Sequence, residues 1–326
     1  MSHPPHDLIA RTHLTRGYSL ALASAAVLST TAILIRYLTV TYQIPALLLA
    51  FWRDLFVFFT LLPALALIRR PFLKVNRRHL PYLVLYGLVL AVFNSFWTLS
   101  VSLNGAAVAT LLAYCSAGFT ALLGWWLLRE GLGWGKLLAV TLCLAGCVLV
   151  SGALTSSSPH LSLPGIITGI LTGLGYAAYT LMGRSASQRG LDPWTSLLYI
   201  FGFASLFLLA FNLLSGGRIP GAVSSLQGFL FLGTHWTGWG VLFLLAAGPT
   251  VIGFGLYNLS LTHLPSSVAN LVATLEPVFT AVSAWFLLGE RLGWIQIAGS
   301  LLILGGVIFL RLYEGRQTAM ERAPTA

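Results

Sequence analysis

The sequence predicts an all-α membrane protein whose ten transmembrane helices form two inverted repeats of five helices each. The first observation is composition, since 57% of the 326 residues are hydrophobic and only 8% are charged, with a mean hydropathy of +0.86. Water-soluble domains carry about 25% charged residues. The second observation is a series of apolar runs of spanning length. The third is a repeat that divides these runs into two sets of five.

Each predicted span is an apolar run of about 20 residues, the length that a helix needs to cross the hydrocarbon core. Connectors rich in charge, Pro, Gly or Ser separate the runs, as at residues 69–79, 155–165 and 216–225. Arg11 and Arg16 precede the first run as in a signal peptide, but no convincing small-x-small cleavage site follows, so we interpret it as a retained span. The ten predicted spans are residues 18–38, 45–68, 81–103, 106–128, 134–152, 164–183, 194–214, 237–262, 265–288 and 294–312.

Basic residues fall mainly on one side when these spans are threaded with the N-terminus in the cytoplasm. The cytoplasmic connectors and tails then hold fourteen Lys and Arg residues, whereas the outside holds only Arg218 and Arg291. Cytoplasmic loops carry an excess of Lys and Arg, so the sequence predicts an even number of spans with both termini in the cytoplasm. The fourteen are Arg11, Arg16, Arg69, Arg70, Lys74, Arg77, Arg78, Arg129, Lys136, Arg184, Arg189, Arg311, Arg316 and Arg322.

The two halves of the chain resemble each other in sequence. AAVATLLAYCSAGFTALLGWWLLREGLGW, residues 106–134, aligns without a gap with SSVANLVATLEPVFTAVSAWFLLGERLGW, residues 266–294, and a weaker match pairs Arg36 with Arg184. Because each half has five spans, the second half enters the membrane inverted, an architecture common in secondary transporters. The predicted organisation is a cytoplasmic tail at 1–17, a first repeat at 18–152, an outer linker at 153–163, a second repeat at 164–312 and a cytoplasmic tail at 313–326.

Ten spans, the five-plus-five repeat and the pattern LEP…LLGERLGW across the last two spans resemble the drug/metabolite transporter superfamily, and within it the EamA-like family. The resemblance covers residues 18–312. It implies the ten-helix fold of that family and a metabolite or drug exporter, or a metabolite exchanger, in a prokaryotic plasma membrane. Amino acids and related compounds are common cargoes of this branch. The first half has Ser116 and Ala117 where the second has Glu276 and Pro277, so the resemblance supports a special role at one copy only.

Glu276 and Pro277 lie near the middle of the ninth predicted span. A charge at the bilayer centre costs about 2.5–3.5 kcal/mol even on the lenient insertion scale. If uncharged, Glu276 is a candidate proton carrier or hydrogen-bond donor; if charged, it needs a cation such as an arginine or a substrate amine. Pro277 removes a backbone N–H and frees a carbonyl near Ala273, so we expect a kink beside the carboxylate. The alternative is a purely structural kink with a satisfied glutamate.

Three further charged residues fall within or at the edge of predicted spans. Arg36, at the outer end of the first span, either snorkels to the headgroups or serves as an extracellular gate. Arg53 and Asp54 lie about 12 Å below the start of the second span. Adjacent helical side chains point in different directions, so we do not expect these two to be partners. Arg53 resembles an arginine often found here in the family, and a structural ion pair and a substrate or gate contact both stay open.

Polar and aromatic side chains recur at helical spacing in four predicted spans. They can line a central cavity with aromatic walls and a few hydrogen-bonding groups, or each can make a hydrogen bond between helices. Gly165, Gly169 and Gly173 recur every fourth residue and predict close helix packing, or alternatively a sliding surface. The cavity candidates, besides Glu276 and Pro277, are Asn94, Trp97, Thr98, Tyr114, Tyr257, Asn258, Asn270 and Thr274.

The lack of enzyme and ATP-binding motifs favours transport over catalysis as the function. No GxSxG, HExxH or Walker loop is present, so we expect no catalytic residue, no cofactor, no metal and no ATP bound by this chain. The net charge of +10 is explained by membrane topology rather than by nucleic-acid binding. The expected partners are a small-molecule substrate, the lipid bilayer and the proton as a candidate coupling ion; no oligomeric state is predicted. The alternatives are a membrane-embedded enzyme that uses Glu276 and Asp54, and a passive channel.

Overall fold

The computed structural model describes residues 5–68, 70–128, 133–150, 163–215, 217–289 and 291–321. Helices and connecting turns make up these residues, and no strand occurs among them. This agrees with the predicted all-α class, because within a bilayer a helix satisfies its backbone N–H and C=O groups internally. Most of the predicted linker at 153–163, together with the predicted terminal residues 1–4 and 322–326, lies outside the described residues.

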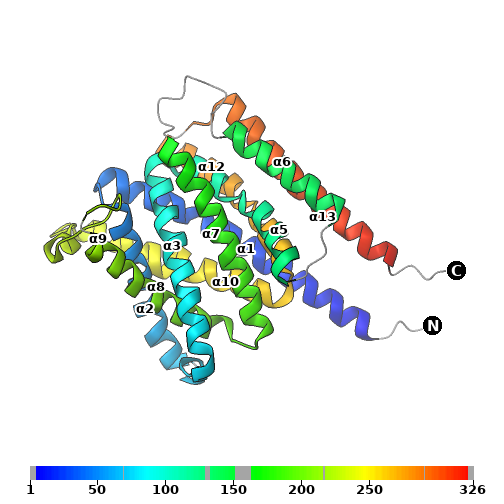
Figure 1. Cartoon of the computed structure of the whole chain (residues 1–326), viewed down its shortest axis with the longest axis horizontal. Helices are drawn as coiled ribbons and strands as arrows, with labels where there is room; N and C mark the ends of the chain where they lie inside the picture. The colour runs from blue at the N-terminus through cyan, green and yellow to red at the C-terminus, as the bar shows by residue number, and fades with distance from the viewer. Residues whose placement is uncertain are drawn as a thin grey trace.

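Thirteen α-helices are described, joined by short 3₁₀ segments and one π-helical turn (Figure 1). Helix α1 begins before the predicted first span, and α13 continues beyond the predicted last one. The α-helices are α1 (Pro5–Thr41), α2 (Ala46–Ile68), α3 (Leu80–Asn104), α4 (Ala106–Ala113), α5 (Ser116–Leu128), α6 (Trp134–Val150), α7 (Leu163–Gln188), α8 (Pro193–Leu214), α9 (Trp236–Leu245), α10 (Val251–His263), α11 (Ser266–Ala273), α12 (Glu276–Leu288) and α13 (Trp294–Glu321). The shorter segments are η1 (Arg70–Leu73), η2 (Arg77–His79), η3 (Leu226–Leu230) and the π turn η4 (Ala246–Thr250).

Local sequence accounts for several helix ends. Asp192 accepts hydrogen bonds from the backbone N–H groups of Trp194 and Thr195, and Pro193 occupies the first turn of α8, a common N-terminal arrangement. Between α9 and α10, Pro249 cannot donate to the Leu245 carbonyl. The hydroxyl of Thr250 donates to that carbonyl instead, at 2.7 Å, so the apolar run bends there without leaving the carbonyl unsatisfied.

Seven helical segments of the described residues are long and apolar enough to cross a membrane. The remaining three predicted spans, at 134–152, 265–288 and 294–312, fall on helices that are shorter or only partly described. The count of ten therefore stays a prediction. The seven are Thr15–Thr41, Ala46–Ile68, Arg77–Asn104, Ala106–Leu127, Leu163–Gln188, Pro193–Leu214 and Trp236–His263.

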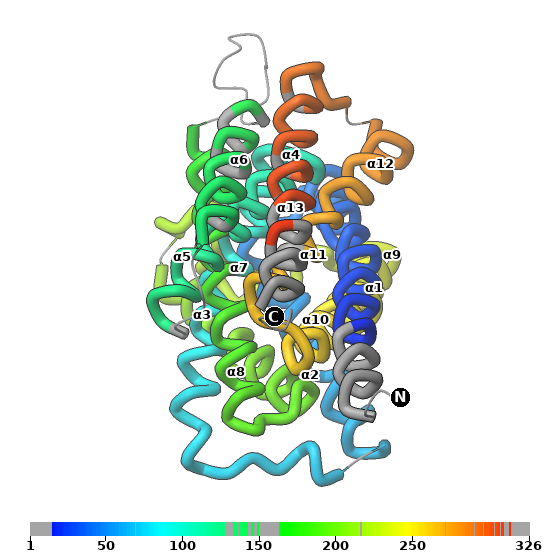
Figure 2. The backbone as a smooth tube through the Cα atoms, turned by 90° about the vertical axis from the view of Figure 1, so that its right-hand side faces the viewer, coloured from blue at the N-terminus to red at the C-terminus, as the bar shows by residue number. Residues whose placement is uncertain are grey.

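Corresponding helices of the two halves make corresponding contacts. Helix α1 packs against α10 and α12, and its counterpart α7 packs against α3 and α5. Helices α6 and α13 pack mainly against each other, on the flank of the bundle (Figure 1), and Figure 2 shows them side by side from the perpendicular direction. Helices α1, α3, α7 and α10 thus surround the centre of the molecule, where the broken helices α4–α5 and α11–α12 meet.

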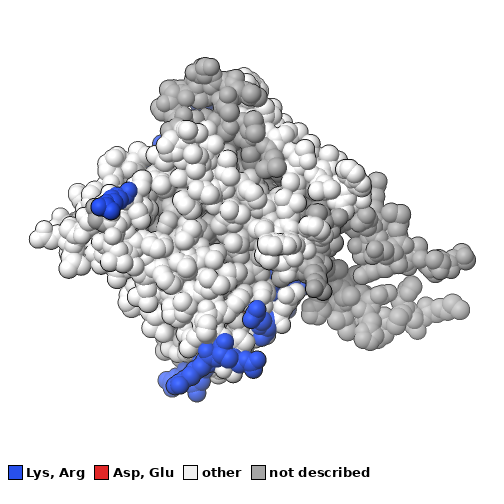
Figure 3. Space-filling model, in the orientation of Figure 1, with Lys and Arg blue, Asp and Glu red and all other residues white. Residues whose placement is uncertain are grey.

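The surface matches a membrane setting. Many large apolar side chains are exposed on it, among them Trp126, Phe286 and Leu287. On the face shown in Figure 3 the Lys and Arg side chains gather chiefly at the lower end, where the connector between α2 and α3 lies, and no Asp or Glu is visible. The first described turns of α1 and the last of α13 lie on the same side of the molecule (Figure 1).

Glycines on α7 allow it to approach the break between α4 and α5. A Cβ atom at Gly173 would lie 2.4 Å from the Cys115 sulfur and 3.1 Å from the Ala113 carbonyl oxygen, and one at Gly169 would lie 2.6 Å from Leu112. These contacts agree with the close packing that the Gly165–Gly169–Gly173 spacing predicts.

Gly173→Ala is expected to destabilise the protein by about 1–3 kcal/mol, because the added methyl group has no space beside Cys115 and Ala113. The measurement is thermal unfolding of the purified protein in detergent. The matched control is Gly240→Ala on α9, where a Cβ meets nothing within 4 Å; it should unfold at or above the wild-type temperature. Equal melting temperatures for the two variants would contradict the close contact.

Candidate functional site

Two helices are broken at equivalent positions of the repeat. The first break separates α4 from α5 after Ala113, and the second separates α11 from α12 after Ala273. At both breaks the backbone makes tighter i to i−3 bonds, from Tyr114 N–H to the Leu111 carbonyl and from Leu275 N–H to the Val272 carbonyl, each at 3.2 Å. Each break thus places a turn of irregular backbone inside the bundle.

The helix breaks beside Glu276, where the kink at Pro277 was expected, but a proline is not required for such a break. Pro277 occupies the first turn of α12, where a missing N–H is tolerated. However, the first half breaks at the equivalent place with Ser116 and Ala117 and no proline. The close approach of α7, whose Gly173 lies against Cys115, accompanies that first break. Tertiary packing can therefore support the break without proline, and Pro277 only matches a geometry that both halves share.

A hydrogen bond joins the two breaks. The Tyr114 hydroxyl, from the first break, donates to Glu276 Oε2, at the second break, over 2.5 Å. Both side chains are buried, with 1% and 6% exposure. No ion pair links Glu276 to a Lys or Arg among the described residues. Glu276 therefore meets a neutral hydroxyl rather than the arginine that a permanently charged carboxylate would need.

A cavity of about 40 Å³ lies beside Glu276. It has room for a few water molecules at most, so a metabolite needs the surrounding helices to move apart. Two buried hydroxyls on its wall, those of Thr31 and Tyr176, have no hydrogen-bond partner among the described residues. The cavity is thus apolar with a few hydrogen-bonding groups. Its lining residues are Leu28, Thr31, Phe93, Trp97, Ala113, Tyr114, Tyr176, Phe254 and Glu276.

A second group of polar side chains surrounds Thr180 on α7. Its hydroxyl shares a 2.8 Å hydrogen bond with the Tyr257 hydroxyl and accepts a 3.3 Å bond from the Asn270 amide. The Ser116 hydroxyl donates to the carbonyl oxygen of Asn270 at 3.2 Å, so the polar contacts run from the first break across α11 to α7. Asn258 donates to the Tyr179 hydroxyl at 2.8 Å. These bonds bring three helices of the second half into contact with the first break.

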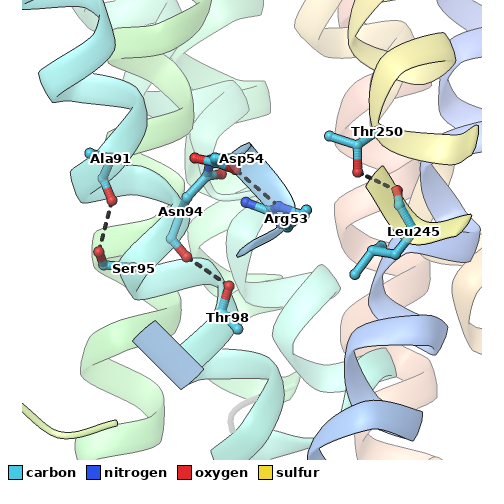
Figure 4. A network of polar contacts seen from close by, with 8 residues as sticks. All are labelled: Arg53, Asp54, Ala91, Asn94, Ser95, Thr98, Leu245 and Thr250. Carbon is cyan, nitrogen blue, oxygen red and sulfur yellow. Dashed lines mark hydrogen bonds and ion pairs between the residues drawn. The ribbon is translucent and has the colours of Figure 1, made fainter. Parts of the chain in front are cut away.

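Arg53, Asp54 and Asn94 form a separate buried cluster between α2 and α3 (Figure 4). Arg53 Nε lies 3.2 Å from Asp54 Oδ1, and the Asn94 amide donates to Asp54 Oδ2 at 2.7 Å. The expectation that the adjacent Arg53 and Asp54 are not partners is therefore wrong, because the long arginine side chain reaches back to its neighbour. Arg53 Nη2 and Asn94 Oδ1 have no partner among the described residues.

Arg36 and its repeat counterpart Arg184 make equivalent contacts. The Arg36 guanidinium donates to the Ser102 carbonyl, two residues before the end of α3, at 2.9 Å. The Arg184 guanidinium donates to the Leu261 carbonyl, two residues before the end of α10, at 2.8 Å. A cation at a helix C-terminus interacts favourably with the unpaired carbonyls and the helix dipole. Both arginines therefore tie helices together at opposite ends of the bundle.

The predicted site residues thus separate into groups. Trp97, Tyr114 and Glu276 line the cavity, while Asn94 belongs to the Arg53–Asp54 cluster and Thr98 donates to the backbone carbonyl of Asn94. Thr274 and Pro277 are buried at the second break. The predicted residues that lie in the hydrogen-bonded network around Thr180 and Tyr179 are Tyr257, Asn258 and Asn270.

Comparison with known proteins identifies the family. The sequence matches the model of the EamA-like transporter family over residues 15–152 and again over residues 163–312. The chain belongs to the EamA-like transporter family. Together with the seven spanning-length apolar helical segments among the described residues, this makes it an integral membrane protein of a transporter family, as its resemblance to the drug/metabolite transporter superfamily indicated.

Relatives of this EamA-like chain are named as transporters. A "Probable amino-acid metabolite efflux pump" of Salmonella typhimurium is 29% identical over 269 residues, which cover 82% of this chain and 85% of the relative. A protein of the same name in Escherichia coli is 26% identical, with the same coverage. An "Uncharacterized transporter" of Archaeoglobus fulgidus is 28% identical over 67% of this chain and 73% of its own length. A solved crystal structure matches with a TM-score of 0.65 at 17% identity, over 95% of this chain and 98% of the other, and shows the same fold.

Sequence reasoning missed several residues around the cavity of this EamA-like protein. Thr31 on α1 and Tyr176 on α7 contribute unpartnered hydroxyls to it. A signal was present for α7, because Tyr176 and Thr180 are four residues apart and share one helix face. The glycines of the same segment instead indicated a helix-packing face, so Tyr176 and Thr180 were not predicted as cavity residues. Thr31 is the third of three consecutive hydroxyl residues, after Ser29 and Thr30, and the sequence does not indicate which of them faces the cavity.

Asp54→Asn is expected to destabilise this EamA-like protein by about 3–5 kcal/mol, because the change leaves the Arg53 guanidinium buried without its counter-charge. Thermal unfolding in detergent measures the loss. The combined change Arg53→Met and Asp54→Leu removes both charges and should recover part of the stability. If the double variant is no more stable than Asp54→Asn, the stability lost in Asp54→Asn does not come from leaving the Arg53 charge unpaired.

Proposed function

We propose that the protein is a secondary active transporter that exports amino acids or related small metabolites by alternating access, with Glu276 as the proton-coupling group. One observation carries the proposal. A buried carboxyl group lies where two broken helices of opposite halves meet, beside a closed cavity. Transporters commonly bind substrate at discontinuous helices between inverted repeats. The relatives named as probable amino-acid metabolite efflux pumps support the substrate class and the direction.

Matching contacts in the two halves support an inverted repeat of five plus five spans. Arg36 and Arg184 bond equivalent carbonyls, α4–α5 and α11–α12 break at equivalent residues, and the two family matches coincide with the two halves. Two structurally similar halves that differ in orientation can exchange their conformations, so that the cavity opens first to one side and then to the other.

The proposed coupling depends on Glu276, an acid whose counterpart in the first half is Ser116. Burial in apolar surroundings disfavours a charged carboxylate, so a proton or a substrate amine can occupy the same group in turn. Tyr114 holds Glu276 through a neutral hydrogen bond. Competition between proton and substrate for one carboxyl group links their movements, since only one of them neutralises it at a time.

The two alternative functions, a membrane-embedded enzyme and a passive channel, require other properties of the same site. An enzyme that uses Glu276 and Asp54 as acid and base needs both carboxyl groups at one cavity. Asp54 instead bonds Arg53 and Asn94 and is not part of the cavity wall beside Glu276. A passive channel would conduct without saturation and without response to a pH gradient, which the transport experiment below tests.

The proposed topology predicts that residue 76 faces the cytoplasm and residue 224 the outside. Both positions are exposed. In whole cells a membrane-impermeant thiol reagent should label Ser224→Cys, whereas Asn76→Cys should react only after permeabilisation. Labelling of both positions from the same side would refute the ten-span arrangement with cytoplasmic termini.

Glu276→Gln should abolish the response of transport to a pH gradient, because glutamine has the shape of the protonated acid and cannot release a proton. The measurement is efflux of a mixture of labelled amino acids from proteoliposomes with and without an imposed gradient. Thermal unfolding in detergent serves as the control for folding, and the variant should unfold at or above the wild-type temperature, because glutamine has the shape of the protonated acid. Efflux by Glu276→Gln that still follows the gradient as in wild type would rule out the proton role.

A further inference from the structure

Five buried tyrosines extend from Glu276 toward the turn between α7 and α8. Ring centroids of successive members lie 5.9, 5.6, 6.4 and 5.1 Å apart. All five side chains are buried, and they come from α3, α7, α10 and the break before α5. We name this set the tyrosine ladder; its members, in order from Glu276, are Tyr114, Tyr176, Tyr257, Tyr179 and Tyr86.

The hydroxyl groups of three ladder tyrosines make hydrogen bonds to neighbouring side chains. Tyr114 donates to Glu276, Tyr257 shares a hydrogen bond with Thr180, and Tyr179 accepts one from Asn258. The hydroxyls of Tyr176 and Tyr86 have no hydrogen-bond partner among the described residues. Buried hydroxyls are nearly always paired with protein or with ordered water, so these two positions call for water.

Both unpartnered hydroxyls lie on cavities. Tyr176 lines the 40 Å³ cavity beside Glu276, and Tyr86 lines a smaller cavity of about 10 Å³ at the other end of the ladder. Three polar atoms of the smaller cavity are unpartnered, namely the hydroxyls of Tyr86 and Ser196 and Oδ1 of Asn258. A cavity of this size with three polar neighbours suits one bound water molecule.

A glycine keeps the smaller cavity open. A Cβ atom at Gly183 would lie 2.9 Å from the Tyr86 hydroxyl and 3.3 Å from Asn258 Oδ1, so both polar atoms face the same point. The cavity also borders Ser187 and Leu191, on either side of the exposed turn at residues 188–190. Its water site is therefore close to the surface that the predicted topology assigns to the cytoplasm.

The geometry points to the tyrosine ladder, with water in its two cavities, as the proton route between Glu276 and the surface at the α7–α8 turn. This inference rests on the proposed role of Glu276 in coupling. When Glu276 releases its proton, each hydroxyl or water accepts one proton and passes its own to the next oxygen. The last water delivers a proton to the surface, so one proton leaves, Glu276 becomes a carboxylate, and no tyrosine stays ionised.

The same rings restrict larger solutes. Packed aromatic side chains at centroid distances of 5.1–6.4 Å leave no space for a metabolite, whereas a proton needs only a chain of hydroxyls and waters. The ladder can thus connect Glu276 with one side of the membrane while the substrate cavity stays closed to that side. The titratable and charged groups near the route, besides the ladder, include Glu276, Tyr82, whose ring lies 6.2 Å from that of Tyr86, and Arg189, over the Tyr82 ring at 4.6 Å. Arg184 follows Gly183 and Asp192 lies between Leu191 and Pro193, so both adjoin residues that line the smaller cavity.

Tyr86→Phe tests the route, because it removes a hydroxyl that makes no hydrogen bond to the described protein and lies far along the ladder from the cavity at Glu276. The experiment follows the carboxylic C=O stretch of Glu276 by time-resolved infrared spectroscopy after a pH jump, with the full-length protein in lipid nanodiscs. The band is assigned by its loss in Glu276→Gln. We expect Tyr86→Phe to slow protonation of Glu276 about tenfold or more, with an unchanged final amplitude.

Two further variants make the outcome decisive. Ser196→Ala removes another unpartnered atom of the same water site and should also slow protonation, without loss of thermal stability. Tyr199→Phe removes a hydroxyl of α8 that donates to the Leu73 carbonyl, outside the ladder, and should leave the rate unchanged. Protonation at the wild-type rate in both Tyr86→Phe and Ser196→Ala would overturn the route. That result leaves the proposed function intact, which fails only if transport by Glu276→Gln still follows the pH gradient.

Discussion

The hydrogen bond from Tyr114 to Glu276 is the contact on which the functional centre depends. In a bilayer, a buried carboxyl group must find its partners within the protein, because no water is available in the surrounding hydrocarbon. The chain meets this requirement by breaking one helix in each half and bringing the two breaks together. The cavity, the network around Thr180 and the tyrosine ladder all lie around this contact. Each contributes polar groups that apolar helices alone would not supply.

The frame around this contact is repeated, whereas its chemistry is not. Arg36 and Arg184 tie equivalent helix ends, and α1 and α7 each contact the equivalent pair of helices in the opposite half. The acid has no counterpart, because Ser116 occupies the equivalent position and donates to Asn270 instead. A repeated frame suits two related conformations of similar free energy. A single titratable group within it lets the proton bias one conformation over the other.

Buried charge has a different role elsewhere in the same molecule. Arg53 and Asp54 neutralise each other, and Asn94 completes the hydrogen bonding of the carboxylate. Breaking such a pair is strongly unfavourable, while the intact pair adds little stability. Glu276 has no such counter-charge among the described residues, and its hydrogen bond comes from a neutral phenol. The two acids therefore differ in what they can exchange, since Glu276 borders the central cavity and Asp54 is not part of its wall.

The amino-acid sequence by itself determined the helical class, the membrane setting and the family, because hydrophobic runs of spanning length and a repeated motif do not depend on tertiary contacts. It also identified Glu276, Tyr114 and Trp97, since polar or aromatic residues in apolar runs stand out one at a time. Only the tertiary structure decided which of these groups meet. It paired Arg53 with Asp54, contrary to the rule for adjacent helical residues, broke α4 from α5 without a proline, and brought Thr31 and Tyr176 to the cavity. Side-chain reach and packing between helices far apart in sequence set these contacts, and neither is encoded in local periodicity.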